Sequence, residues 1–122
     1  MNYTAILLYK RNEFIHNDAF DFVFEIYDSQ NNLITDLDSL KFSAIITDDS
    51  YTISKYDANY SAGADSQISV ANGKVTVHIL TDDTNNFDGD YVMELQLENK
   101  STGFRQTVYR QNLNFIDEKL ND

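Results

Sequence analysis

The sequence has no cysteine, no proline and no tryptophan, and only four glycines and two histidines among its 122 residues. Without cysteine the chain has no disulfide framework, no thiolate metal site and no thiol nucleophile. Antibody domains combine an inter-sheet disulfide with a tryptophan in the core, so these absences exclude a domain of that type. A folded domain of this composition must rely on an apolar core.

Basic residues are also scarce. Nine Lys and Arg stand against 20 Asp and Glu, which gives a formal net charge of −11. Because nucleic acids and anionic lipids both attract basic residues, this balance argues against nucleic-acid and membrane partners. The acidity predicts a soluble chain whose copies repel one another. A divalent-cation site or a basic partner is the functional alternative.

Long hydrophobic runs are absent as well, since no apolar stretch approaches the roughly 20 residues that span a bilayer. The short apolar patch from Ala5 to Tyr9 is not preceded by positive charge, and Lys10 and Arg11 follow it. A signal peptide has the opposite order. We therefore expect this patch to form a strand, and the chain to be made in the cytoplasm and used without secretion.

The residues that are present indicate one folded domain. Apolar residues make up 42% of the chain, and its length is typical of a single domain with a core of its own. We expect this domain to span residues 1–122. An N-terminal strand or arm at residues 1–14 and a polar tail at residues 117–122 flank its body.

Apolar and polar residues alternate along most of the chain. The clearest stretch, residues 18–28, places Phe20, Phe22, Phe24 and Ile26 on one face, which is typical of a half-buried strand. Further strands are predicted at residues 40–46, 51–56, 67–71, 74–80, 91–98 and 104–116. Asn72-Gly73 between two of them indicates a tight hairpin. Seven or eight short strands predict an all-β fold, most simply a single immunoglobulin-like antiparallel β-sandwich.

One acidic loop is a candidate calcium site. Asp82, Asp83, Asp88 and Asp90 lie close together between two predicted strands, and calcium prefers such oxygen-rich loops. The EF-hand pattern does not fit, because Leu95 falls where a bidentate glutamate is required. We expect a solvated turn here, with these four acids as the candidate ligands if calcium binds. No other cofactor is expected.

Catalytic residues are hard to find. His78 is predicted on the outward face of a strand and His16 in a loop, and nothing near either residue indicates a Ser-His-Asp system. A triad assembled from distant parts of the chain stays open. Acids are too numerous for any pair to indicate glycoside hydrolysis. We therefore expect a protein that is not an enzyme.

Three tyrosines are candidate binding residues. Tyr51, Tyr56 and Tyr60 fall within one predicted strand and the loop after it. Exposed tyrosines stack on sugars or anchor protein interfaces, because the ring is apolar and the hydroxyl is polar. The alternative is that these rings cover the faces and edges of the sheets.

Three stretches carry a resemblance to a known family. They are DAFDFVFEIYDSQNNLITDL, KVTVHILTDDTNNFDGDYVMELQLEN and GFRQTVYRQNLNF, at residues 18–37, 74–99 and 103–115. Their order resembles the immunoglobulin-like modules of tailed-phage particles, such as small capsid-associated proteins and the N-terminal modules of baseplate upper proteins. The resemblance covers roughly residues 15–116. In place of the family's usual first-turn glycine the chain has Asn31-Asn32, which also permits a turn.

The resemblance implies a structural protein of the virion, most simply an auxiliary (decoration) protein bound in many copies to the capsid exterior. Its partners would be the major capsid protein, other virion proteins or further copies of itself. A single acidic domain suits the head better than the tail, where such modules usually continue into others. A baseplate or receptor-binding module is one alternative, and a carbohydrate-binding module is an alternative of another class.

Overall fold

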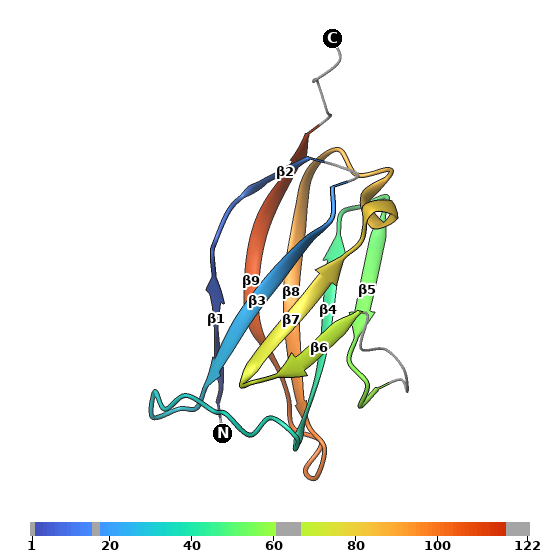
Figure 1. The fold of residues 1–122 in the computed structure, drawn as a ribbon. Coiled ribbons are helices and arrows are strands. Elements are labelled where there is room, and N and C mark those ends of the chain that lie inside the picture. Colours follow the sequence, from blue (N-terminus) through green and yellow to red (C-terminus); the bar gives the residue numbers. More distant parts are fainter. Residues whose placement is uncertain (1, 16–17, 61–66, 117–122) are drawn as a thin grey trace.

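The computed structural model describes residues 2–15, 18–60 and 67–116. In this part of the chain, nine strands form two sheets that pack face to face, with one short 3-10 helix between two of the strands (Figure 1). His16, the polar tail and the second half of the loop before residue 67 lie outside the described residues. No helix in the described segments has the length and apolar character needed to cross a membrane.

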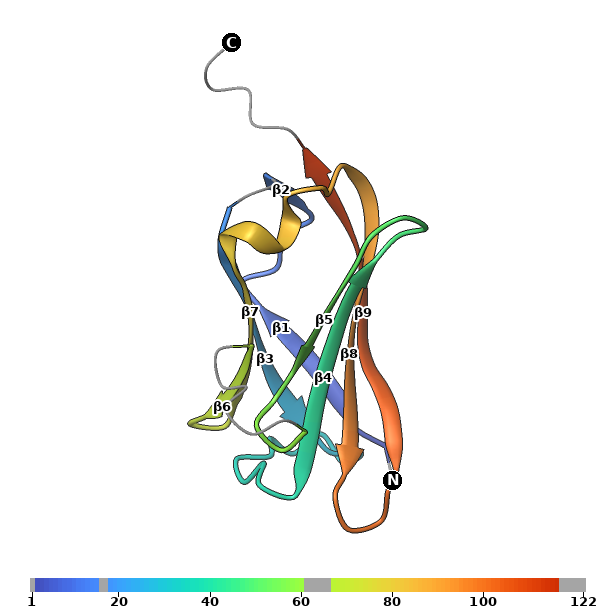
Figure 2. The same cartoon turned by 90° about the vertical axis from the view of Figure 1, so that its right-hand side faces the viewer.

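The two sheets have four and five strands. The first runs in the order β1 (Thr4–Leu8), β3 (Phe20–Tyr27), β7 (Lys74–Ile79) and β6 (Ile68–Ala71). The second runs in the order β2 (Glu13–Ile15), β9 (Arg105–Ile116), β8 (Gly89–Asn99), β4 (Leu40–Thr47) and β5 (Thr52–Tyr56). Figure 2 shows the layers edge-on, with β6 and β7 in one and β4, β8 and β9 in the other.

This strand order is immunoglobulin-like. One sheet corresponds to the ABED sheet of a constant-type domain, and β9, β8 and β4 correspond to the GFC sheet. The fold class expected from the sequence is therefore confirmed. The N-terminal segment differs from expectation, because it forms two strands: β1 pairs antiparallel with β3, and β2 crosses over to pair parallel with β9.

The core follows the predicted alternation. On β3, Phe22, Phe24 and Ile26 are buried, and they belong to the same core cluster as the buried residues of β8, such as Met93 and Leu95. Around Phe115 at the end of β9, aromatic rings from several elements meet in one cluster: Phe14, Phe20, Phe87 and Tyr91. This cluster joins the two sheets at one end of the sandwich.

The turns use the residues that the sequence indicated. Asn72 and Gly73 have φ angles of 56° and 73°, so the hairpin between β6 and β7 forms as predicted. Asn31 has a φ of 65° in the turn after β3. The family that this sequence resembles usually has glycine in that turn. Asparagine tolerates this left-handed conformation, because its short polar side chain bonds to the local backbone.

Candidate functional site

The acidic loop is organised by an ion pair and a helix. Thr81–Thr84 form the 3-10 helix, and the carboxylate of Asp83 accepts hydrogen bonds from the Lys55 ammonium (2.6 Å) and from the backbone N–H of Leu80 (2.7 Å). Lys55 is buried and comes from the edge strand β5. Asp83 therefore ties this edge strand to the loop, and its charge is already neutralised by Lys55.

The other three acids point elsewhere. Asp90 is the second residue of β8 and accepts a hydrogen bond from the Asn114 side chain (2.9 Å), while Asp82 and Asp88 are exposed. Across the described residues, no group of three or more His, Asp or Glu is placed to hold a metal ion. The four acids that the sequence marked as candidates are thus not brought together, because the helix and the start of β8 direct them apart.

We expect calcium to have no effect on stability. A ligand that binds the folded state raises its melting temperature, and calcium needs six to eight converging oxygen ligands. Melts in 5 mM calcium chloride and in chelator, at about equal ionic strength so that screening is matched, should therefore give the same midpoint. A higher midpoint in calcium alone would show that the Asp82–Asp90 loop rearranges around the ion.

Two of the three candidate tyrosines meet. The rings of Tyr56 and Tyr60 pack edge to face with centroids 5.7 Å apart, and the Lys41 ammonium lies 4.6 Å from the Tyr60 centroid. The Tyr60 hydroxyl donates to Glu98 (3.2 Å). Burial and the Glu98 charge raise the pKa of Tyr60, so it stays a neutral hydrogen-bond donor. Tyr56 remains 41% exposed.

Tyr51 lies apart from this pair. It precedes β5, whereas Tyr56 ends the strand, so the length of β5 separates them. Its backbone N–H donates to the Asp48 carboxylate (2.8 Å) in the turn after β4. The three tyrosines therefore do not form one platform. Tyr56 adjoins a hollow of about 130 Å³, whose polar lining comes from Ser43, Ser54 and Gln96.

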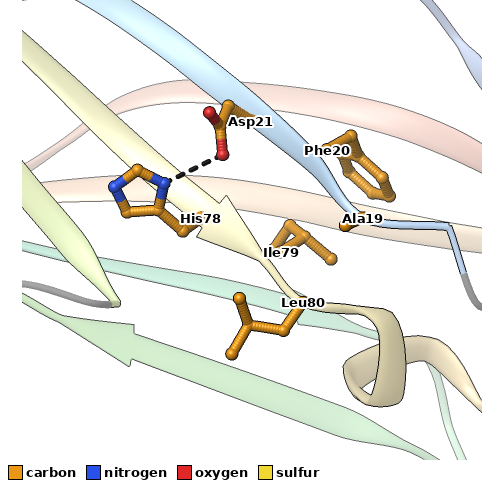
Figure 3. A pocket seen from close by; sticks show the side chains of 6 residues that line it. All are labelled: Ala19, Phe20, Asp21, His78, Ile79 and Leu80. Carbon is orange, nitrogen blue, oxygen red and sulfur yellow. Dashed lines mark hydrogen bonds and ion pairs between the residues drawn. The ribbon is translucent and has the colours of Figure 1, made fainter.

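The structure also assembles three residues that the sequence did not connect. The Ser69 hydroxyl lies 2.7 Å from Nε2 of His78. Nδ1 of His78 in turn lies 2.9 Å from a carboxylate oxygen of Asp21, and Figure 3 shows this second pair. The residues come from the neighbouring strands β6, β7 and β3. The Asn72-Gly73 hairpin indicates that Ser69 is near His78, but nothing in the sequence indicates Asp21.

Serine, histidine and aspartate follow one another here as in a catalytic triad, but the residues around them differ from those of a hydrolase active site. Efficient acyl transfer needs N–H donors that converge beside the serine oxygen. Ser69 lies within a regular strand, where successive N–H groups point to opposite edges and cannot converge above the face. The Asp21 side chain is 52% exposed, so water competes for its carboxylate.

The nearest hollow leads to the same conclusion. It measures about 380 Å³ and is lined by Asp21, His78 and apolar neighbours, including Phe20 and Leu80 (Figure 3). Ser69 instead lines a separate hollow of about 340 Å³, whose lining does not include His78 or Asp21. A molecule bound in either hollow would therefore meet only part of the Ser69-His78-Asp21 group. The two contacts form a hydrogen-bonded ladder that links the edge strand β6 to β7 and β3.

Changing Ser69 to alanine tests this assignment. We expect the free energy of unfolding to fall by about 1 kcal/mol, the typical contribution of one such hydrogen bond. Hydrolysis of p-nitrophenyl acetate should be the same for the variant, for Ser54→Ala as a control and for the unmodified protein. A hydrolysis rate that falls only in Ser69→Ala would show that the ladder is a nucleophilic centre.

Comparison with known proteins yields a likeness of fold. No protein-family model and no curated protein matches the sequence. Among solved structures, the endo-β-1,4-mannanase of Thermotoga petrophila matches with a TM-score of 0.55 and 13% sequence identity. The match covers 97% of this chain and 20% of the mannanase, so the chain spans about a fifth of that protein's length. At this level of identity, the similarity shows a shared fold alone.

Proposed function

We propose that this protein is a non-enzymatic structural protein of a tailed-phage particle, bound in many copies to the capsid exterior. The observation that carries the proposal is the strand order of the sandwich. It agrees with the immunoglobulin-like module that residues 18–37, 74–99 and 103–115 resemble. The agreement is independent of those motifs, because strand order depends on pairing between distant segments.

The surface is suited to docking. The edge strands are β1 and β6 in the first sheet and β2 and β5 in the second. Another chain can pair a strand with such an edge or pack against it. Exposed apolar side chains lie on these edges, including Ile6 on β1, Val70 on β6 and Tyr56 on β5. Weak contacts of this kind become firm when many copies bind one particle.

The net charge of −11 favours an outer location. An acidic exterior keeps particles dispersed through mutual repulsion, and it gives no attraction for packaged DNA. The major capsid protein is then the main partner. The same fold would also serve at the tail tip, as a baseplate or receptor-binding module, and the experiment below separates the two locations.

Immunogold microscopy tests the proposal directly. Antibody raised against the recombinant chain should label the heads of particles from the source phage, because decoration proteins cover the capsid surface. Label at the tail tip alone would replace the capsid assignment with a baseplate role. Unlabelled particles, with antibody that detects the protein in the same lysate, would contradict a role on the virion surface.

A carbohydrate-binding module is the second candidate, and one observation favours it. Tyr56 stands half-exposed beside the hollow lined by Ser43, Ser54 and Gln96, and an aromatic ring next to polar side chains suits a sugar ring. One solved structure with a similar fold is a mannanase. If this candidate is right, immobilised mannan retards the unmodified chain and Tyr51→Ala but not Tyr56→Ala. The capsid proposal predicts no retardation of any of them.

A further inference from the structure

Tyr9, at the corner between β1 and β2, has an unusual backbone conformation for a tyrosine. Within the described residues, three non-glycine residues have a positive φ, and the other two, Asn31 and Asn72, are asparagines in turns. Tyr9 has a φ of 57° and is 90% exposed. A bulky side chain is disfavoured in this conformation, and an exposed ring gains little from burial. Glycine or asparagine would suit the corner better on grounds of folding alone.

The residues that follow Tyr9 are held firmly. The Gln111 side chain on β9 donates to the backbone carbonyl of Arg11 (2.7 Å), and the backbone N–H of Asn114 donates to the carbonyl of Asn12 (2.8 Å). The Arg11 guanidinium lies 4.5 Å from the centroid of the Phe14 ring. Strained conformations persist where the surroundings over-determine them, and they concentrate at functional positions. The Tyr9 ring is thus exposed to solvent, while the backbone that follows it is held in place by β9.

A polar hollow adjoins the corner. It measures about 470 Å³, and its lining includes the cations Lys10 and Arg110 and the amides of Asn12, Asn112 and Asn114. Arg110 is paired with Glu94, which lies outside this lining, whereas Lys10 has no ion-pair partner among residues 2–15, 18–60 and 67–116.

The charge of the hollow contrasts with that of the whole chain. Its lining is close to neutral, because Asp90 offsets one of the two bases and Glu94 pairs with Arg110, while the chain carries 20 acids against nine bases. A negatively charged group is therefore repelled less here than over most of the molecule, and the Lys10 ammonium stands ready to pair with it.

We infer that Tyr9 and this hollow form the contact by which the domain docks on an acidic segment of a protein partner. The Tyr9 ring fills an apolar pocket of the partner, and a partner carboxylate enters the hollow beside Lys10. Tyrosine is enriched among residues that dominate binding energy, because its ring buries a large area with little loss of side-chain freedom. The inference rests on the proposed function, under which this partner is a protein of the phage particle.

Binding to capsids that lack the domain tests the inference. Capsids from a phage with this gene deleted are mixed with the recombinant chain, and bound protein is measured after sedimentation. We expect Tyr9→Asn and Lys10→Glu each to weaken binding at least tenfold, and Tyr51→Ala, an exposed tyrosine far from the corner, to bind like the unmodified chain. The melting temperature of Tyr9→Asn should be unchanged or higher, because asparagine adopts the positive φ at less cost.

The outcomes separate this inference from the proposed function. Unmodified chain that binds the capsids, together with Tyr9→Asn that binds equally well, overturns the inference and leaves the capsid role intact. Unmodified chain that does not bind the capsids overturns the proposed function, and with it the partner named here. Equal weakening by Tyr51→Ala also overturns the assignment of the contact to the corner.

Discussion

Replacing Phe115 with alanine is expected to lower the free energy of unfolding by about 4 kcal/mol, within the range measured for buried phenylalanines. Phe115 is fully buried near the end of β9. Its ring centroid lies 5.6 Å from that of Phe14, 5.1 Å from that of Phe87 and 5.4 Å from that of Tyr91. These rings come from β2, the loop after the 3-10 helix and β8. The cavity left by the missing ring would therefore open where several elements meet, and no single element could shift to fill it.

Urea denaturation followed by tyrosine fluorescence measures this loss. Ile116→Ala is the matched control, because Ile116 is the next residue of the same strand and is 42% exposed. It should cost about 1 kcal/mol or less, since little of its surface is withdrawn from water. Similar losses for the two variants would mean that β9 is not packed at this end as the structure places it.

Replacing Asp57 with alanine is expected to lower the free energy of unfolding by about 3 kcal/mol, because hydrogen bonds to a charged group would be lost and the N–H of the buried Phe42 would lose this acceptor. Asp57 is 2% exposed. One carboxylate oxygen accepts from the backbone N–H of Phe42 (2.9 Å), and the other accepts from those of Asn59 (3.1 Å) and Tyr60 (3.3 Å). Asp57 thereby fixes the turn that carries Tyr60 to the start of β4.

Asp38→Ala is the control for this variant. Asp38 is exposed and lines the same hollow of about 340 Å³ as Asp57. Removing it changes the net charge equally but breaks no buried hydrogen bond, so its effect should stay within about 0.5 kcal/mol. If Asp38→Ala proves as costly as Asp57→Ala, the loss comes from charge and the hydrogen bonds of Asp57 contribute little.

The pH dependence of Asp57 has a definite sign. Burial raises the pKa of its carboxyl above the ordinary 3.8, against the opposing effect of the backbone hydrogen bonds. Between the unfolded and folded values the folded state binds more protons, so this group's contribution to stability falls as pH rises through that interval. The variant Asp57→Asn carries an amide at this position, and an amide does not titrate.

The stability difference between the unmodified protein and Asp57→Asn should therefore be largest below pH 3.8 and should narrow as pH rises above it. Urea titrations of both proteins at a series of pH values measure this difference. A difference that widens with rising pH would indicate that the three backbone N–H groups outweigh burial and lower the pKa instead.

The candidate site was only partly predictable. Tyr56 and Tyr60 are four residues apart, and the structure brings their rings together. Tyr51 is also near Tyr56 in the sequence, but it lies at the opposite end of β5. Sequence proximity fails here because an extended strand advances about 3.3 Å per residue and carries its two ends apart. The same geometry explains the four acids, which share a loop but are directed to different neighbours.

Local features were determined by the sequence alone. Alternation along β3 predicted which face is buried, and Asn72-Gly73 predicted a hairpin with two positive φ angles, because both depend on neighbouring residues only. The tertiary structure decided how distant segments pair. It split the N-terminal segment between two sheets at Tyr9, and it brought Asp21 to His78 across 57 positions. Such pairings depend on the summed packing of whole strands, which no short stretch of sequence contains.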